Sequence, residues 1–276
     1  MTLSERNILF KAGIVFCAIS TIFILLASFL VVPLYPSMEE NARRPAVFSQ
    51  FFTGMFLNAN YFAVHASVIM SVLFSLAGII MIHSFFEQTS APEILFIAFF
   101  TISLSFETIR LILPLNIIYD IPSFYLLLAS RILLFARYFG VFSLFAASVY
   151  AAGLDMQRTS TIILIIIIAS LVITFGVLID IQNWDTSFNT STGYISMLRL
   201  IDGVMFIASV IGFFIAVNVR GSKYYAHVGI GVMLALAGRN LLLVSDNLAC
   251  PVPGILMLSI GTWLICSKLH RIYLWL

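Results

Sequence analysis

The sequence predicts an all-α membrane protein, a single domain of about eight transmembrane helices over residues 1–276. Its composition is the first reason: 62% of the residues are hydrophobic and only 9% are charged, with a mean hydropathy of +1.10. The second reason is that apolar runs recur along the whole chain. Each run is long enough for the roughly 20 helical residues that cross a hydrocarbon core of about 30 Å.

Proline, glycine and polar clusters mark the ends of these apolar segments. In chain order the segments are residues 8–35, 57–86, 93–118, 122–152, 159–183, 193–218, 223–246 and 251–274. A count of seven stays open if the last two segments form a re-entrant hairpin.

The first segment follows a weakly basic start and is read as a retained span. Its apolar run is longer than the 7–15 residues typical of a cleaved signal peptide, and it ends at Pro33. The connection after it, residues 36–56, is the long one, and its phenylalanines predict an interfacial amphipathic stretch.

The later segments are joined by short polar connections, such as Asp120-Ile121-Pro122 and Gly221-Ser222. A possible duplication links the two halves of the chain. Arg110 followed by Pro122 matches Arg239 followed by Pro251 at an offset of 129 residues. Four spans per half would make this a parallel repeat.

Lysine and arginine positions predict the orientation, because cytoplasmic loops of membrane proteins are enriched in both. With eight spans, both termini share one side. Seven lysines and arginines fall on that side: Arg6, Lys11, Arg158, Arg220, Lys223, Lys268 and Arg271. The other side has only Arg43 and Arg44. We therefore expect a multi-pass protein of the plasma membrane, or of the inner membrane in a bacterium, with both termini in the cytoplasm.

Several ionisable residues lie inside the apolar segments, where a charge is costly and is by default a functional-site candidate. Counting 1.5 Å per residue from the segment ends places them in one layer, in the outer half of the membrane. The layer comprises Arg110, Arg131, Arg137, Arg199, Arg239, Glu107, Asp202, Asn240 and His65. The inner half of these spans is expected to be nearly free of charge.

This layer carries five arginines against two carboxylates. Glu107 with Arg110, and Arg199 with Asp202, are spaced i,i+3 and can pair on one helix face. The excess positive charge predicts an anionic ligand, because arginine suits bidentate contacts with carboxylate or phosphate. The structural alternative is a set of interhelical ion pairs, with spare arginines extending to the headgroups. For His65, the hydrogen-bonded core histidine is the favoured reading.

Other chemistries are not indicated. The three lysines lie at span ends, so no lysine is placed for a retinal Schiff base, and the four histidines and three cysteines show no metal-ligand spacing. No cofactor or metal is expected. A net charge of +2 without a Lys/Arg cluster argues against nucleic acid as a partner.

The leading prediction is a transporter with an outward-facing cationic pocket for an anionic small molecule or lipid headgroup. One alternative is a sensor or accessory subunit acting through a partner membrane protein. The other is a membrane-embedded enzyme acting on a phosphorylated lipid, with Glu107 or His65 as general base. The expected partners are the lipid bilayer, the anionic ligand, and either a second copy of the chain or another membrane protein.

Overall fold

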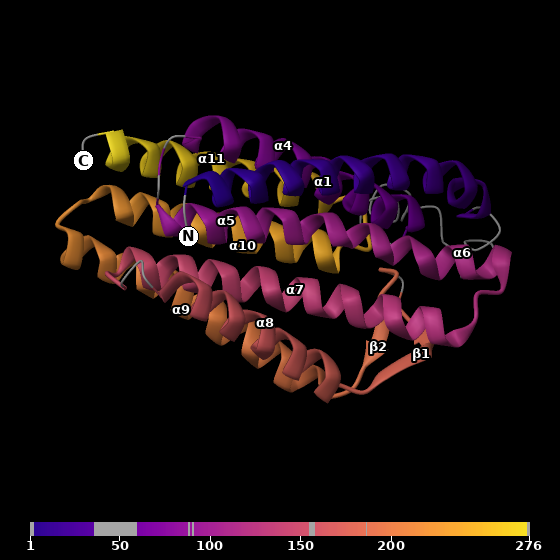
Figure 1. The fold of residues 1–276 in the computed structure, drawn as a ribbon. Helices are drawn as coiled ribbons and strands as arrows, with labels where there is room; N and C mark the ends of the chain where they lie inside the picture. The colour runs from indigo at the N-terminus through magenta and orange to yellow at the C-terminus, as the bar shows by residue number, and fades with distance from the viewer. Residues whose placement is uncertain are drawn as a thin grey trace, which may run out of the picture.

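Long helices lying side by side make up almost all of the chain (Figure 1). The structure is a computed structural model and describes residues 3–35, 60–87, 89, 91–154, 158–185 and 187–274. The elements are α1 (Leu3–Val31), η1 (Val32–Leu34), α4 (Tyr61–Phe86), α5 (Pro92–Ser103), η3 (Leu104–Leu111), α6 (Ile112–Tyr119), α7 (Ser123–Ala151), α8 (Thr159–Gly176), β1 (Ile179–Trp184), β2 (Thr190–Thr192), α9 (Ile195–Arg220), α10 (Tyr224–Val244) and α11 (Pro251–Leu274). Here η denotes a 3₁₀-helix.

Within the described chain, eight helical stretches are long and apolar enough to cross a membrane. One of them is the continuous run of α5, η3 and α6, 28 residues from Pro92 to Tyr119. The prediction of an all-α multi-pass bundle is confirmed. The last two stretches have 21 and 23 residues, so each is long enough to span by itself. The predicted interfacial stretch at 36–56 lies outside the described residues.

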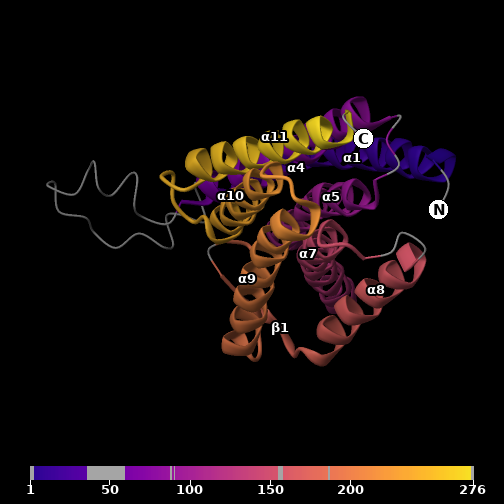
Figure 2. The ribbon, with the colours of Figure 1, turned by 90° about the vertical axis from the view of Figure 1, so that its left-hand side faces the viewer.

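The α5–η3–α6 run is the centre of the bundle. In its most apolar window, 78% of the residues are buried, against 22% for α8 and 17% for α9. Its neighbours are α1, α4 and α7. Both α8 and α9 pack on α7 and lie on different sides of it (Figure 2). Their exposed leucines, isoleucines and valines are the surface expected of helices that face lipid.

Two ends of the bundle can be distinguished. The first residues of α1 and the last residues of α11 lie at one end, and the β1–β2 hairpin lies at the other (Figure 1). We call these the terminal end and the hairpin end. The hairpin departs from the sequence prediction, which continued the fifth segment to residue 183. Instead α8 ends at Gly176, and β1 then pairs antiparallel with β2, with Ile179 opposite Thr192.

The glycines of α10 allow a close helix contact. A Cβ on Gly238 would lie 2.5 Å from the backbone nitrogen of Leu258, and one on Gly231 would lie 2.8 Å from the carbonyl oxygen of Gly261. Small residues let helix backbones approach in this way. The helix α10 is continuous, and these two glycines face α11.

Arginines bind the free carbonyl groups at the ends of other helices. At the terminal end, Arg6 donates to Phe86 O (2.7 Å) at the end of α4, and Arg220 donates to Ala151 O (3.3 Å) at the end of α7. At the hairpin end, Arg131 donates to Thr174 O (2.5 Å) in the last turn of α8. The last four carbonyls of a helix have no partner within it, and a cation there also favours the helix dipole.

Candidate functional site

The 3₁₀ geometry of η3 sorts its side chains onto three edges. With three residues per turn, positions i and i+3 eclipse one another. Leu104, Glu107 and Arg110 therefore share one buried edge. Phe106, Ile109 and Ile112 share an edge that stays partly exposed. The i,i+3 relation read from the sequence is thus a direct alignment of carboxylate and guanidinium.

Pro114 accounts for the change of helix type at this place. A proline within a helix offers no N–H to the carbonyl four residues earlier, here Arg110, and its ring crowds that carbonyl. The α-helical hydrogen bonding of the segment is therefore broken at the turn that carries the charges. Eight residues is long for a 3₁₀-helix, and such stretches inside longer helices often mark functional hinges.

Glu107 is the centre of the charged cluster, and its side chain is 2% exposed. Arg137 of α7 binds it with both arms of the guanidinium: Nε donates to Oε1 (2.9 Å) and Nη2 to Oε2 (2.7 Å). Arg110 adds a longer ion pair, with Nη1 3.7 Å from Oε2. A bidentate arginine–carboxylate pair of this kind is the strongest form of side-chain hydrogen bonding between these groups.

Two residues of the hairpin loop bind the same arginines. Arg137 Nη2 donates to Asn189 Oδ1 (2.8 Å), and Arg110 Nε donates to Ser187 O (3.0 Å), with Arg110 Nη2 bonded to the same carbonyl. Arg110 Nη2 also lies 3.5 Å from Leu243 O in the last turn of α10. The loop therefore covers the cluster from the hairpin end.

Aromatic packing holds this loop in place. Phe188 is completely buried and has a left-handed backbone conformation, with φ of 54°. Its ring stacks on Tyr61 (centroids 5.5 Å apart) and Tyr35 (6.0 Å), and Trp184 lies at 5.9 Å. Because Phe188 lies between Ser187 and Asn189, anchoring its ring fixes both arginine contacts.

The strand before this loop has a polar contact of its own. Asp180 on β1 accepts hydrogen bonds from the side chain of Asn183 (2.8 Å) and from the backbone N–H of Gln182 (3.0 Å). These bonds stabilise its carboxylate, so the pKa of Asp180 lies below its usual range.

His65 lies outside the arginine cluster and supports the aromatic packing. Its Nδ1 is 2.8 Å from the hydroxyl of Tyr35, and its Nε2 is 2.8 Å from Oγ of Ser28. Ser28 Oγ in turn donates to Ile24 O (2.6 Å). The arrangement that satisfies every group has Tyr35 donating to Nδ1 and Nε2–H donating to Ser28. This matches the alternative reading of His65 as a hydrogen-bonded core histidine.

The other predicted site residues divide into two groups. Arg239 belongs to the cluster: it is 3% exposed, and its Nη2 donates to the backbone carbonyl of Arg137 (2.9 Å). Asp202 on α9 is half-buried, and its negative charge acts on Arg137 and Arg239. Three arginines and two carboxylates thus come together, Arg110, Arg137 and Arg239 with Glu107 and Asp202.

The remaining three residues lie elsewhere. Arg131 points to the end of α8, where its guanidinium also lies 5.3 Å from the ring centroid of Phe175. Arg199 and Asn240 are exposed. Within the described ranges, Arg199 and Asp202 do not form the ion pair that their spacing allows, since their charged atoms are more than 4.0 Å apart. Equal depth in the sequence did not imply the same face of the helix.

Sequence reasoning missed both the hairpin contacts and a second buried carboxylate. Asn189, Ser187 and Phe188 were assigned to a plain loop, although a phenylalanine between polar loop residues is a weak signal of anchoring. Glu93, in the first turn of α5, is 1% exposed and accepts a hydrogen bond from the hydroxyl of Tyr273 (2.8 Å). It lies at the terminal end, which was expected to be nearly free of buried charge.

Comparison with known proteins adds no assignment to this geometry. No protein-family model matches the chain, and no curated protein matches it at a significant level. The function therefore has to be argued from the cluster and its surroundings.

Proposed function

We propose that the chain transports an anionic solute or an anionic lipid headgroup, which binds Arg137 and Arg110 from the hairpin end. The observation that carries this proposal is the broken helical segment at the charges. A carboxylate and an arginine lie on a 3₁₀ stretch in the central segment of a membrane bundle, under a loop that binds both Arg110 and Arg137. Transporters commonly form their binding sites at such interruptions of membrane helices.

In this proposal Glu107 occupies the position of the transported anion. Its two oxygens satisfy the guanidinium of Arg137 in the geometry that a ligand carboxylate or phosphate would adopt. An entering anion displaces Glu107 from Arg137, and the three arginines then face the charge of the ligand as well as that of Asp202. The ligand has to compensate for the broken ion pair, so a doubly charged anion is favoured over a singly charged one.

The hairpin loop is the gate of this site. Entry of a ligand requires that Asn189 leave Arg137 and that Ser187 leave Arg110, while Phe188 leaves the aromatic packing around Tyr35 and Tyr61. The hairpin lies outside the cell in this proposal, and both termini lie in the cytoplasm. The seven-to-two distribution of Lys and Arg supports this orientation. An impermeant thiol reagent applied to intact cells should label Asn183→Cys and leave Ser222→Cys unlabelled.

Transport is better supported than lipid chemistry. Both candidate bases of the enzyme alternative are already bonded, since Glu107 accepts from Arg137 with both oxygens and His65 uses both ring nitrogens. A general base needs a free lone pair directed at its substrate. In proteoliposomes incubated with labelled phosphatidic acid, we expect no headgroup release. Release that is lost in Glu107→Gln would favour the enzyme.

Uptake by proteoliposomes tests the proposal directly. The probes are radiolabelled inorganic phosphate, succinate and glycerol 3-phosphate, with fluorescent phosphatidylglycerol as the lipid probe. We expect protein-dependent uptake of at least one probe, its loss in Arg137→Gln, and less than a tenth of it in Arg137→Lys, which lacks the bidentate fork. Arg271→Gln, a change of an exposed arginine in α11, is the matched control.

Each other result has a definite meaning. If a probe raises the melting temperature of the wild-type protein but none is taken up, the chain is a sensor or accessory subunit. If Arg137→Gln transports as well as the wild type, the cluster is an architectural ion-pair network and the proposed binding site is wrong.

A further inference from the structure

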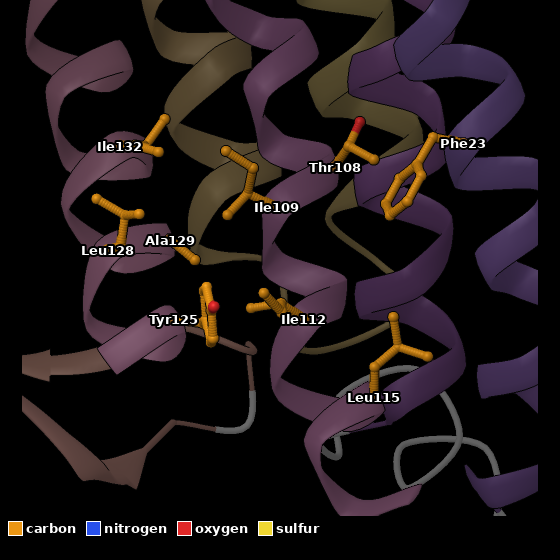
Figure 3. A pocket seen from close by; sticks show the side chains of 9 residues that line it. All are labelled: Phe23, Thr108, Ile109, Ile112, Leu115, Tyr125, Leu128, Ala129 and Ile132. Carbon is orange, nitrogen blue, oxygen red and sulfur yellow. The ribbon is translucent and has the colours of Figure 1, made fainter. Parts of the chain in front are cut away.

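A groove of about 280 Å³ lies along the partly exposed edge of η3, away from its charged edge. Figure 3 shows the side chains that line the groove. Ile109 and Ile112 form its floor, Phe23 of α1 forms one wall, and Tyr125, Ala129 and Ile132 of α7 form the other. The floor thus belongs to the exposed edge of the same 3₁₀ stretch. The groove is open at its walls, where Phe23 is 54% exposed and Ile132 is 37% exposed.

We propose that this groove binds one acyl chain of a phospholipid from the leaflet at the hairpin end. The proposal depends on the membrane-spanning fold and is independent of the proposed transport. The groove opens on the surface of three membrane-spanning stretches, where the molecules available to fill it are lipids. Apolar walls on three sides give a chain more dispersion contacts than the flat surface of a helix.

The chemistry of the lining selects an apolar occupant. Thr108 is the polar residue at the rim besides Tyr125, and its hydroxyl donates to Ser105 O (2.8 Å), so it is already used. No charged side chain lines the groove. By comparison, an apolar protein cavity of about 150 Å³ stays dry and binds benzene. This groove is larger than that and suits a longer hydrocarbon.

The length of the groove favours an acyl chain over a helix from a partner. From Tyr125 to Ile132 the groove runs seven residues along α7, about 10 Å at 1.5 Å per residue. An α-helix rises about 5.4 Å per turn, so the groove would contact no more than about two of its turns. The length is about two-thirds of one leaflet of a 30 Å core, which a single chain covers.

The test is native mass spectrometry of the full chain in detergent, with palmitoyl-oleoyl phosphatidylcholine added after delipidation. The Ala129→Phe substitution fills the groove, and Ala208→Phe makes the same change at a half-buried position of α9. Ile132→Trp is a second filling variant at a more exposed position, in case Ala129→Phe does not fold. We expect one retained phospholipid on the wild type and on Ala208→Phe, and at least a tenfold lower occupancy on each filled variant.

The outcomes separate the possibilities. Equal lipid retention by all four proteins, or none by the wild type, overturns the proposal. Displacement of the phospholipid by added free palmitate supports the proposal, because the apolar lining contacts the acyl chain alone. A dimeric mass that the wild type shows and the filled variants lose would also overturn it, and would show instead that the groove is an interface between copies.

Discussion

Glu93 and Glu107 are two buried carboxyl groups on the same membrane-spanning stretch, and their binding partners differ in charge. Glu107 is held by the bidentate guanidinium of Arg137 and by Arg110, on a 3₁₀ turn beneath the hairpin loop. Glu93 lies on a regular α-helical turn at the terminal end and is bound by the hydroxyl of Tyr273. In the described part of the chain, no Lys or Arg nitrogen lies within 4.0 Å of it.

The difference shows what the arginines do at each end. At the terminal end, Arg6 and Arg220 bind carbonyl groups of helix termini, and the buried carboxyl group is left to a neutral donor. At the hairpin end, three arginines gather near Glu107, and two of them, Arg110 and Arg137, also bind the loop. Arginines bind helix ends at both ends of the bundle, but only the hairpin end of the described chain also concentrates them around a carboxylate.

The largest expected effect is a difference in stability between two variants that carry the same substitution, one at each carboxyl group. Glu107→Gln leaves the buried Arg110 and the half-buried Arg137 without the carboxylate that both contact, and breaking a buried pair typically costs about 3–5 kcal/mol. Glu93→Gln keeps an acceptor for Tyr273 and should cost about 1 kcal/mol or less. Reversible unfolding in mixed micelles measures both. Equal losses would mean that Glu93 has a charged partner in the membrane after all.

A second experiment asks whether Glu107 and Arg137 act as a unit. The double variant Glu107→Gln/Arg137→Gln removes both charges and leaves two amides able to bond each other. We expect it to be more stable than the sum of the single changes by about 2 kcal/mol, within the range found for residues in one network. Additive losses in the same unfolding assay would contradict a direct pair. They would leave Asp202 as the partner of Arg137.

A smaller effect is expected from the hydroxyl at the terminal end. Tyr273→Phe removes the hydrogen bond to Glu93 and should lower stability by about 1–3 kcal/mol, the cost of leaving a buried polar group unsatisfied. Combining it with Glu93→Leu, which removes the acceptor, should recover most of the loss. A double variant as unstable as the two losses added together would show that the two side chains are not coupled.

The smallest effect is expected at Arg199, which was predicted to belong to the charged layer but lies outside the cluster. Arg199 is exposed, so Arg199→Gln should change stability by no more than about 0.5 kcal/mol. The matched change Arg239→Gln removes a buried cation near Glu107 and Asp202 and should cost several times more. If Arg199→Gln is as damaging as Arg239→Gln, Arg199 joins the cluster in the membrane-embedded protein.

Local patterns predicted the spans and the Glu107–Arg110 pair, because hydropathy and i,i+3 spacing are properties of a few neighbouring residues. They could not predict the loop contacts, since Ser187 lies 77 residues from Arg110 and Asn189 lies 52 from Arg137 along the chain. The depth of a residue in the membrane was also not enough to predict which residues meet. Six residues separate Arg131 from Arg137, a turn of about 240° around an α-helix, so the two point to different neighbours.

The 3₁₀ geometry of η3 also determines how long this membrane-spanning segment is. A 3₁₀-helix rises about 2.0 Å per residue and an α-helix about 1.5 Å, so eight residues are about 4 Å longer in the first form. The two forms also differ by about 20° of rotation per residue, about 160° over the whole stretch. Rewinding η3 as an α-helix would draw α6 and the α6–α7 corner inward by about 4 Å. It would also rotate Glu107 relative to Arg137. In this segment, a small change in length is therefore coupled to a large rotation of its side chains about the helix axis.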